Sequence, residues 1–188
     1  MVAPGVVRII GGQWRGRQIK VLSDPNLRPT PDRVRETLFN WLMGHIVNAS
    51  CLDLFAGTGV LGFEALSRGA KRVVFVDNFA PGVQALKSIA AQLGAADQCE
   101  IVRSDALSWL EKPTHSAFDV IFLDPPYREQ TLLQQTIDRL ANSPLISAKT
   151  LIYIEAPEII SPDKLPSAWQ LLKQKTAGEV AYHLVQGG

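Results

Sequence analysis

One stretch of the sequence decides the fold: Phe118-Asp119-Val120-Ile121-Phe122-Leu123-Asp124-Pro125-Pro126-Tyr127. Its apolar residues predict a buried strand over 118–123, and the strand must end at the prolines because proline donates no hydrogen bond to a sheet. Asp124 and Tyr127 are therefore expected on a stiff turn at the carboxyl end of a strand. Ligands bind at this edge in open α/β sheets, so the turn is the first candidate for a functional site.

The sequence around this stretch alternates predicted strands and helices, which is typical of a mainly parallel sheet. Strands are predicted at 51–55, 72–76, 99–103, 118–123 and 150–154, and helices at 59–68, 80–93, 105–111 and 129–141. The end differs, because Trp169–Lys175 and Glu179–Val185 predict an antiparallel hairpin that turns at Ala177-Gly178. We therefore expect an α/β fold with a doubly wound, seven-stranded sheet.

The composition fits one folded domain. The chain has 188 residues, of which 46% are hydrophobic and 20% are charged, and its formal net charge is +1. A chain of this size can bury about 70% of its unfolded surface, and the composition argues against disorder. The first residues lack the features of a signal peptide, and no apolar run is long enough to span a bilayer. We expect a soluble, cytoplasmic, monomeric protein without membrane contact.

Positive charge is concentrated near the N-terminus. Residues 1–36 contain seven arginines and lysines and three acidic residues, a local charge of +4, which leaves −3 for the rest of the chain. Two strands are predicted here, Val6–Ile10 and Arg17–Leu22, with a glycine-containing turn between them. A basic hairpin on a mildly acidic body predicts a polyanionic partner. Trp14 could stack on a base between the arginines, or it could pack on the body, and both alternatives stay open.

A helix is expected to follow a rigid link. Thr30 and Pro31 are typical of an N-cap and a first helical residue, and the apolar spacing predicts a helix that runs to about Gly44. Arg28, Arg33 and Arg35 lie near its start. They could face solvent or the ligand cleft, where Arg28 and Arg33 could bind a cofactor carboxylate or an RNA phosphate.

A glycine loop follows the first strand of the sheet, in Asp53-Leu54-Phe55-Ala56-Gly57-Thr58-Gly59. Such a loop lets the backbone approach a ligand closely and offers it a helix N-terminus. With Gly62 the glycines form a G-x-G-x-x-G pattern, and Asp77 ends the next strand where a ribose-binding acid is expected. This pattern predicts a nucleoside cofactor, either a dinucleotide or another kind.

Two acids favour a cationic cofactor over a dinucleotide. Asp53 precedes the loop, where a pyrophosphate would meet negative charge and a sulfonium cofactor with its ammonium group would be attracted. Asp105 ends the third strand, where it could accept a hydrogen bond from an adenine amine or cap the helix that follows, and both roles can hold together.

This succession of motifs resembles the class I S-adenosylmethionine-dependent methyltransferases that carry an Asp-Pro-Pro-Tyr motif. The resemblance narrows to the RsmD family through Arg8–Gly12, Arg15-Gly16-Arg17, Leu27–Thr30 and Arg33–Asn40. It implies a Rossmann-like methyltransferase domain over 30–188 and a basic N-terminal β-hairpin extension over 1–29. It also implies S-adenosylmethionine as cofactor and methylation of the N2 amine of a guanine in small-subunit ribosomal RNA. The partner is then ribosomal RNA, within the small subunit or its precursor.

The candidate residues fall into three groups. The catalytic group is Asp124, Pro125, Pro126 and Tyr127. The cofactor-binding group is Asp53, Phe55, Ala56, Gly57, Thr58, Gly59, Asp77, Asn78, Asp105 and Ala106. The RNA-binding group is Arg8, Trp14, Arg15, Arg17, Arg28 and Arg33. No metal site is expected, because the three histidines are scattered without the spacing of metal ligands.

The residue types suit methyl transfer to a base. The amino nitrogen of a base is a poor nucleophile, and hydrogen bonds from its protons to the Asp124 carboxylate and the Pro125 carbonyl would aim its lone pair at the methyl group. Tyr127 provides a flat face for an extruded base. From the motif alone, an adenine-N6 methyltransferase acting on DNA or RNA remains an alternative. A nicotinamide-dependent oxidoreductase and an inactive RNA-binding module are the rivals from other classes.

Overall fold

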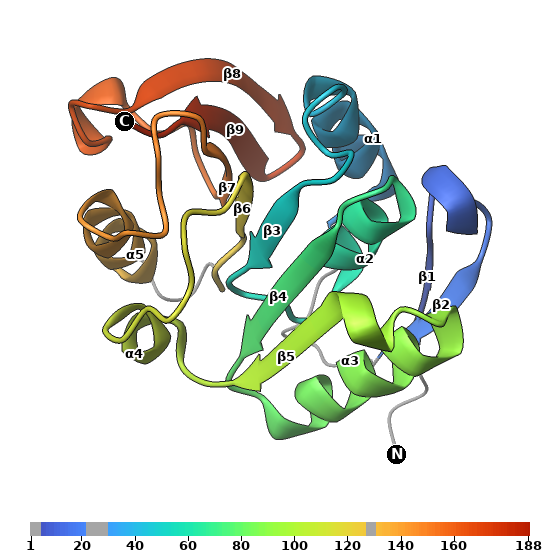
Figure 1. Cartoon of the computed structure of the whole chain (residues 1–188). Coiled ribbons are helices and arrows are strands. Elements are labelled where there is room, and N and C mark those ends of the chain that lie inside the picture. The colour runs from blue at the N-terminus through green and yellow to red at the C-terminus, as the bar shows by residue number, and fades with distance from the viewer. Residues whose placement is uncertain (1–4, 22–29, 127–130) are drawn as a thin grey trace.

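The computed structural model describes residues 5–21, 30–126 and 131–188 and contains one large sheet in this part of the chain (Figure 1). Its strand order is β5-β4-β3-β6-β7-β9-β8. The strands are β3 Ser50–Asp53, β4 Arg72–Asp77, β5 Cys99–Arg103, β6 Val120–Leu123, β7 Leu151–Ala156, β8 Gln170–Ala177 and β9 Val180–Gln186. The first five are mutually parallel, and β9 pairs antiparallel with both β7 and β8. The predicted fold class is therefore confirmed.

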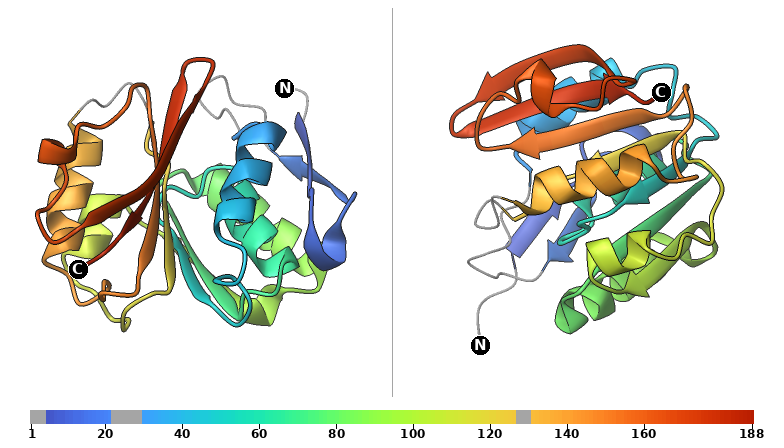
Figure 2. Two further views of the ribbon diagram at one scale, coloured as in Figure 1. Left: turned by 90° about the horizontal axis from the view of Figure 1, so that it is seen from above. Right: turned by 90° about the vertical axis from the view of Figure 1, so that its left-hand side faces the viewer.

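Helices cover both faces of the sheet (Figure 2). The helices are α1 Asp32–Trp41, α2 Val60–Ser67, α3 Ala80–Leu93, α4 Ala106–Leu110 and α5 Leu132–Ala141. Short 3₁₀ turns are η1 Gly12–Trp14, η2 Ala96–Gln98 and η3 Pro162–Lys164. Helices α1, α2 and α3 pack on one face and α4 and α5 on the other, so each face has its own hydrophobic cluster. In the described ranges, none of the helices is both long and apolar enough to cross a bilayer.

The central strands are buried on both sides, as expected for a sheet with helices on each face. Every residue of β6 and β7 is buried, including the single charged residue among them, Glu155. Phe122 and Tyr153 pack toward α1, where Phe122 contacts Phe39 at 6.1 Å between ring centroids. This rigid centre holds the carboxyl ends of β6 and β7 in fixed positions.

The N-terminal hairpin consists of β1 Gly5–Arg8 and β2 Gln18–Val21, which form a separate antiparallel sheet beside α2. Trp14, between them, is only 8% exposed, and its backbone amide donates to Ser67 Oγ at 3.0 Å. A Cβ at Gly12, which has φ +74°, would lie 1.8 Å from the Ser67 carbonyl oxygen. Of the two alternatives for Trp14, the structure therefore supports packing on the body, which leaves little of the ring accessible to an RNA base.

The largest difference from the predicted elements concerns α1. The helix begins at Asp32 with Pro31 as its N-cap, and no side chain caps it. It ends at Trp41 rather than Gly44, because His45 N bonds the Leu42 carbonyl in a turn and Gly44 takes φ +87°. The predicted capping role of Thr30 is therefore wrong. The predictions for Leu22, Arg28, the 27–29 link, Tyr127 and the helix start at 129–130 lie outside the described residues.

Candidate active site

The topological switch point of the sheet lies between β3 and β6, because the chain leaves β3 toward β4 and leaves β6 toward β7. Ligands bind at such a point, outside the carboxyl ends of the strands. Five neighbouring strands each bring one acid to this edge. From β5 to β7 these are Asp105, Asp77, Asp53, Asp124 and Glu155.

The glycine loop adopts a conformation that only glycine accepts without strain. Gly57 has φ +51° and Gly59 has φ +74°. A Cβ at Gly59 would lie 2.3 Å from Leu86 Cδ2 and 2.7 Å from Phe63 Cε2. The Gly57 amide donates to Asp77 Oδ2 at 2.6 Å, so the loop is fastened to the end of β4. The two predicted parts of the cofactor site are thus in contact.

Gly59→Ala is expected to lower the free energy of unfolding by about 2–4 kcal/mol. The alanine would be strained in a left-handed backbone conformation, and its methyl group would overpack the space beside Leu86 and Phe63. Gly94→Ala is the matched control, since Gly94 has φ +68° but no atom within 4 Å of its Cβ position. That variant should lose only the backbone part, about 1–2 kcal/mol. Urea unfolding measures both, and equal losses would contradict the packing role of Gly59.

Asp53 is enclosed behind the loop. It is 2% exposed and accepts a hydrogen bond from the Gly62 amide at 3.1 Å, in the first turns of α2. Burial raises the pKa of its carboxyl to about 7, the Gly62 amide opposes the shift, and the charge of Asp77 adds to it. The negative charge of Asp53 is therefore costly in the free protein, and a cation at this edge would stabilise it.

Asp124 follows β6 as predicted and is partly exposed, with Pro125 buried and Pro126 exposed. Thr30, which is 4% exposed, donates its hydroxyl to Asp124 Oδ2 at 3.5 Å. Burial and the charges of Glu155 and Asp53 raise the pKa of the Asp124 carboxyl well above its usual range, and the Thr30 hydrogen bond opposes this. The candidate catalytic carboxylate therefore lies among other acids.

Arg35 is fully buried beside this turn, so the expectation that it faces solvent or the cleft is wrong. Its Nε donates to the Thr30 carbonyl at 3.2 Å, and its Nη2 donates to the Arg8 carbonyl at 3.0 Å. It also forms ion pairs with Asp32 and with Glu64, the latter at 3.3 Å. Arg35 thus connects the start of α1 to the N-terminal hairpin and to α2.

Glu64 completes this network from α2. It accepts hydrogen bonds from the Ile10 amide at 2.9 Å and from Arg68 Nε at 2.8 Å, and it is itself fully buried. The hairpin is therefore fixed to the domain through backbone groups that bond a buried ion pair. The sequence patterns did not predict the contact between Thr30 and Asp124 or the buried Arg35–Glu64 pair. For the pair, the sequence offered one signal: Glu64 is the single charged residue in the otherwise uncharged helix Val60–Ser67.

The remaining predicted residues are distributed as follows. Asp105 accepts a hydrogen bond from the Ser108 amide at 3.0 Å, which confirms its role as the cap of α4. Thr58, Ala56 and Ala106 are buried, Phe55 is half-buried, and Asn78 is exposed, all at the same edge. The arginines of the RNA-binding group within the described residues, Arg8, Arg15, Arg17 and Arg33, are all exposed.

The strand order, the glycine loop after β3 and the Asp-Pro-Pro turn after β6 together define a class I methyltransferase fold. A family model described as Conserved hypothetical protein 95 matches residues 7–186. The chain belongs to this family, which confirms the resemblance to the RsmD family drawn from the sequence.

Similar proteins cover nearly the whole chain. Ribosomal RNA small subunit methyltransferase D of Haemophilus influenzae is 46% identical over 186 residues, 98% of this chain and 95% of that relative. The protein of the same name from Escherichia coli K12 is 44% identical over 183 residues, 97% of this chain and 90% of that relative. The solved structure of yhhF from Escherichia coli matches with a TM-score of 0.87 at 44% identity, covering 97% of this chain and 98% of that one.

Proposed function

We propose that this protein is an S-adenosylmethionine-dependent methyltransferase that modifies the N2 amine of a guanine in small-subunit ribosomal RNA. The observation that carries the proposal is the position of Asp124. It follows β6 beside the glycine loop of β3, across the switch point of a methyltransferase sheet. The names of relatives that are 46% and 44% identical to this chain suggest the ribosomal substrate.

The residues at the carboxyl edge suit this cofactor. The loop Gly57–Gly59 would lie against its methionine part, Asp77 would bind the ribose hydroxyls, and Asp105 would bind the adenine amine. The Asp77 oxygens already accept the amides of Gly57 and Phe79, at 2.6 and 2.7 Å, which fixes the carboxylate while further lone pairs stay free. Burial raises the pKa of Asp53 and of Asp124, so a ligand with positive charge would stabilise their charged forms. When bound, S-adenosylmethionine supplies an electrophilic methyl group.

Asp124 and Pro125 would hold the target amine. The carboxylate would accept a hydrogen bond from one N–H of the amine and stabilise the positive charge that develops on nitrogen, and the Pro125 carbonyl would accept a hydrogen bond from the other N–H. Thr30 donates to Asp124 Oδ2, which keeps the carboxylate oriented and favours its charged form. This chemistry needs no strong base, because positioning and electrostatics lower the barrier.

The raised pKa of Asp53 predicts how stability depends on pH. Between 3.8, its ordinary pKa, and about 7, the folded protein holds a proton that the unfolded chain has released. The free energy of unfolding should therefore fall as pH rises through this window. Asp53→Asn should reduce the slope without abolishing it, because the raised pKa of Asp124 acts in the same direction. Urea unfolding at several pH values tests this, and an unchanged slope in the variant would contradict it.

The N-terminal hairpin would dock the RNA. Arg8, Arg15 and Arg17 are exposed on it, and the hairpin is fixed to the domain by the Arg35–Glu64 pair. Guanidinium groups bind phosphates through paired hydrogen bonds, so such a surface binds an RNA backbone without reading its sequence. The small domain has few elements for reading a sequence, which favours an assembled ribosomal particle as the substrate.

The direct test is to incubate the protein with methyl-labelled S-adenosylmethionine and small subunits from cells that lack the gene, then to identify the labelled nucleoside. N2-methylguanosine at a single position of the small-subunit RNA is expected. Labelled N6-methyladenosine would establish the alternative target base, and small subunits that stay unlabelled would refute the ribosomal assignment. Guanine is favoured because its neighbouring N1–H and N2–H form a pair of donors that one carboxylate can accept together.

A further inference from the structure

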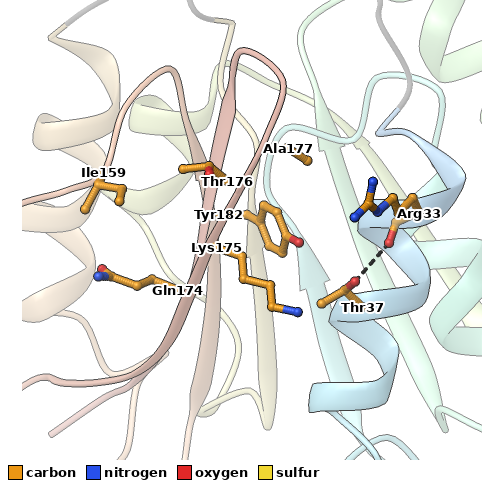
Figure 3. Close-up of a pocket in the computed structure, with 8 residues that line it drawn as sticks. All are labelled: Arg33, Thr37, Ile159, Gln174, Lys175, Thr176, Ala177 and Tyr182. Carbon is orange, nitrogen blue, oxygen red and sulfur yellow. Dashed lines mark hydrogen bonds between the residues drawn. The ribbon is translucent and has the colours of Figure 1, made fainter.

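A second basic surface lies on the other side of α1 from the N-terminal hairpin. It is an open groove of ≈ 470 Å³ that extends from α1 across the β8–β9 hairpin to Ile159 (Figure 3), which we call the basic groove. Its lining residues are Arg33, Thr37, Ile159, Gln174, Lys175, Thr176, Ala177 and Tyr182. We propose that the basic groove binds the backbone of the RNA segment that flanks the target base; this rests on the proposed function.

Two residues that line the groove, Tyr182 and Lys175, lie level with Asp124 across the neighbouring strands of the sheet. Asp124 follows Leu123, the register partner of Ile154, so it lies level with Glu155. Glu155 pairs with Tyr182, which in turn pairs with Lys175. Lys175 is thus three strand spacings from Asp124, about 14 Å at about 4.8 Å per spacing. A stacked strand rises about 3.4 Å per nucleotide, so this distance corresponds to about four nucleotides.

The charge of the groove matches a polyanion. Arg33 approaches from α1 and Lys175 extends toward the helix from β8, as Figure 3 shows. Lys173, two residues along the same face of β8, places its ammonium 6.0 Å from the centre of the Trp41 ring. The acidic residues on these elements, Asp32, Glu36 and Glu179, are not among the described residues that line the groove.

The floor of the groove is aromatic and rigid. Tyr182 is 3% exposed and stacks on Trp41 with ring centroids 5.3 Å apart. Trp41 and Thr37 follow Arg33 at intervals of four residues, so all three lie on the face of α1 that borders the groove. Side chains held this firmly lose little conformational freedom when a ligand binds. The basic residues therefore project from a fixed scaffold, as a backbone-binding track requires.

Lys173→Gln combined with Lys175→Gln tests the proposal. The matched control is Lys71→Gln with Lys149→Gln, which makes the same change of charge at exposed lysines before β4 and β7, at the opposite edge of the sheet. The groove variant should raise the KM for small subunits about tenfold and leave the KM for S-adenosylmethionine unchanged. It should also change the slope of log K for RNA binding against log salt concentration. The slope should become less negative by about 1.4, which is about 0.7 for each of two lost single-strand phosphate contacts. Thermal unfolding checks that both variants are folded.

The other outcomes overturn one proposal or both. If wild type methylates small subunits and the groove variant matches the control in KM and salt dependence, the groove proposal is wrong and the proposed function stands. If the KM for the particle rises while binding of naked RNA keeps its salt dependence, the groove binds a ribosomal protein, which also refutes the proposal. If wild type methylates no RNA, the proposed function fails and the groove proposal fails with it.

Discussion

Asp124→Ala is expected to lower kcat for methyl transfer by about 10³-fold, because in the proposed function this carboxylate orients the amine and stabilises its developing charge. The affinity for S-adenosylmethionine should remain close to that of wild type, since the carboxylate lies beyond the glycine loop, at the end of the next strand. Single-turnover assays with saturating small subunits measure the chemical step, and calorimetry measures cofactor affinity.

Asp124→Asn separates charge from shape. It keeps the size of the side chain but offers a neutral amide, so most of the loss should persist. Asp97→Asn is the control, because Asp97 is an exposed acid on η2 and its loss makes the same change of charge. Activity above about a tenth of wild type in either Asp124 variant would remove this carboxylate from the mechanism.

Glu64→Ala is expected to destabilise the protein by about 3–5 kcal/mol, because it removes the buried partner of the Arg35 guanidinium and leaves the half-exposed Asp32 to pair with it. The Arg35 and Glu64 side chains are both fully buried, and Glu64 also bonds the backbone of the N-terminal hairpin at Ile10. The hairpin should therefore detach first, which limited proteolysis can detect. The free energy of unfolding is measured with urea.

Burial rather than distance decides this effect, and an exposed pair provides the comparison. Arg139 and Glu111 lie closer together, at 2.8 Å, but are 40% and 60% exposed. Glu111→Ala should therefore cost at most about 1 kcal/mol. The double variant Arg35→Met with Glu64→Leu should be more stable than Glu64→Ala, since it buries no unpaired charge. Similar losses from Glu64→Ala and Glu111→Ala would refute the structural role of the buried pair.

The sequence was sufficient for the parts of the fold that depend on local pattern. The alternation of strand and helix patterns predicted the parallel sheet. The two prolines predicted that a strand ends at Asp124, and β6 does end just before it. The loop glycines marked a turn with left-handed backbone, and Gly57 and Gly59 both have positive φ, which glycine adopts without strain. These features follow from backbone geometry, which each short segment determines largely by itself.

Features that depend on distant segments were not predictable in the same way. From the sequence, Trp14 could stack on a base or pack on the body, and Arg35 could face solvent or the cleft, yet both are buried and bonded to α2. Thr30 looks like a helix cap, but its hydroxyl bonds Asp124, 94 residues away. In each case a long-range partner outweighs the local preference, and nothing within the segment identifies that partner.

The row of acids at the carboxyl edge has a consequence for the dynamics of the protein. Asp53 and Asp77 end β3 and β4, and Asp105 follows β5, so the three acids lie at the ends of adjacent strands that the chain reaches one after another. A cofactor bound across this edge, as we propose, would join these strands through contacts that the sheet itself lacks. Occupancy should therefore slow amide hydrogen exchange along β3, β4 and β5 together, so that the ligand acts as a removable crosslink.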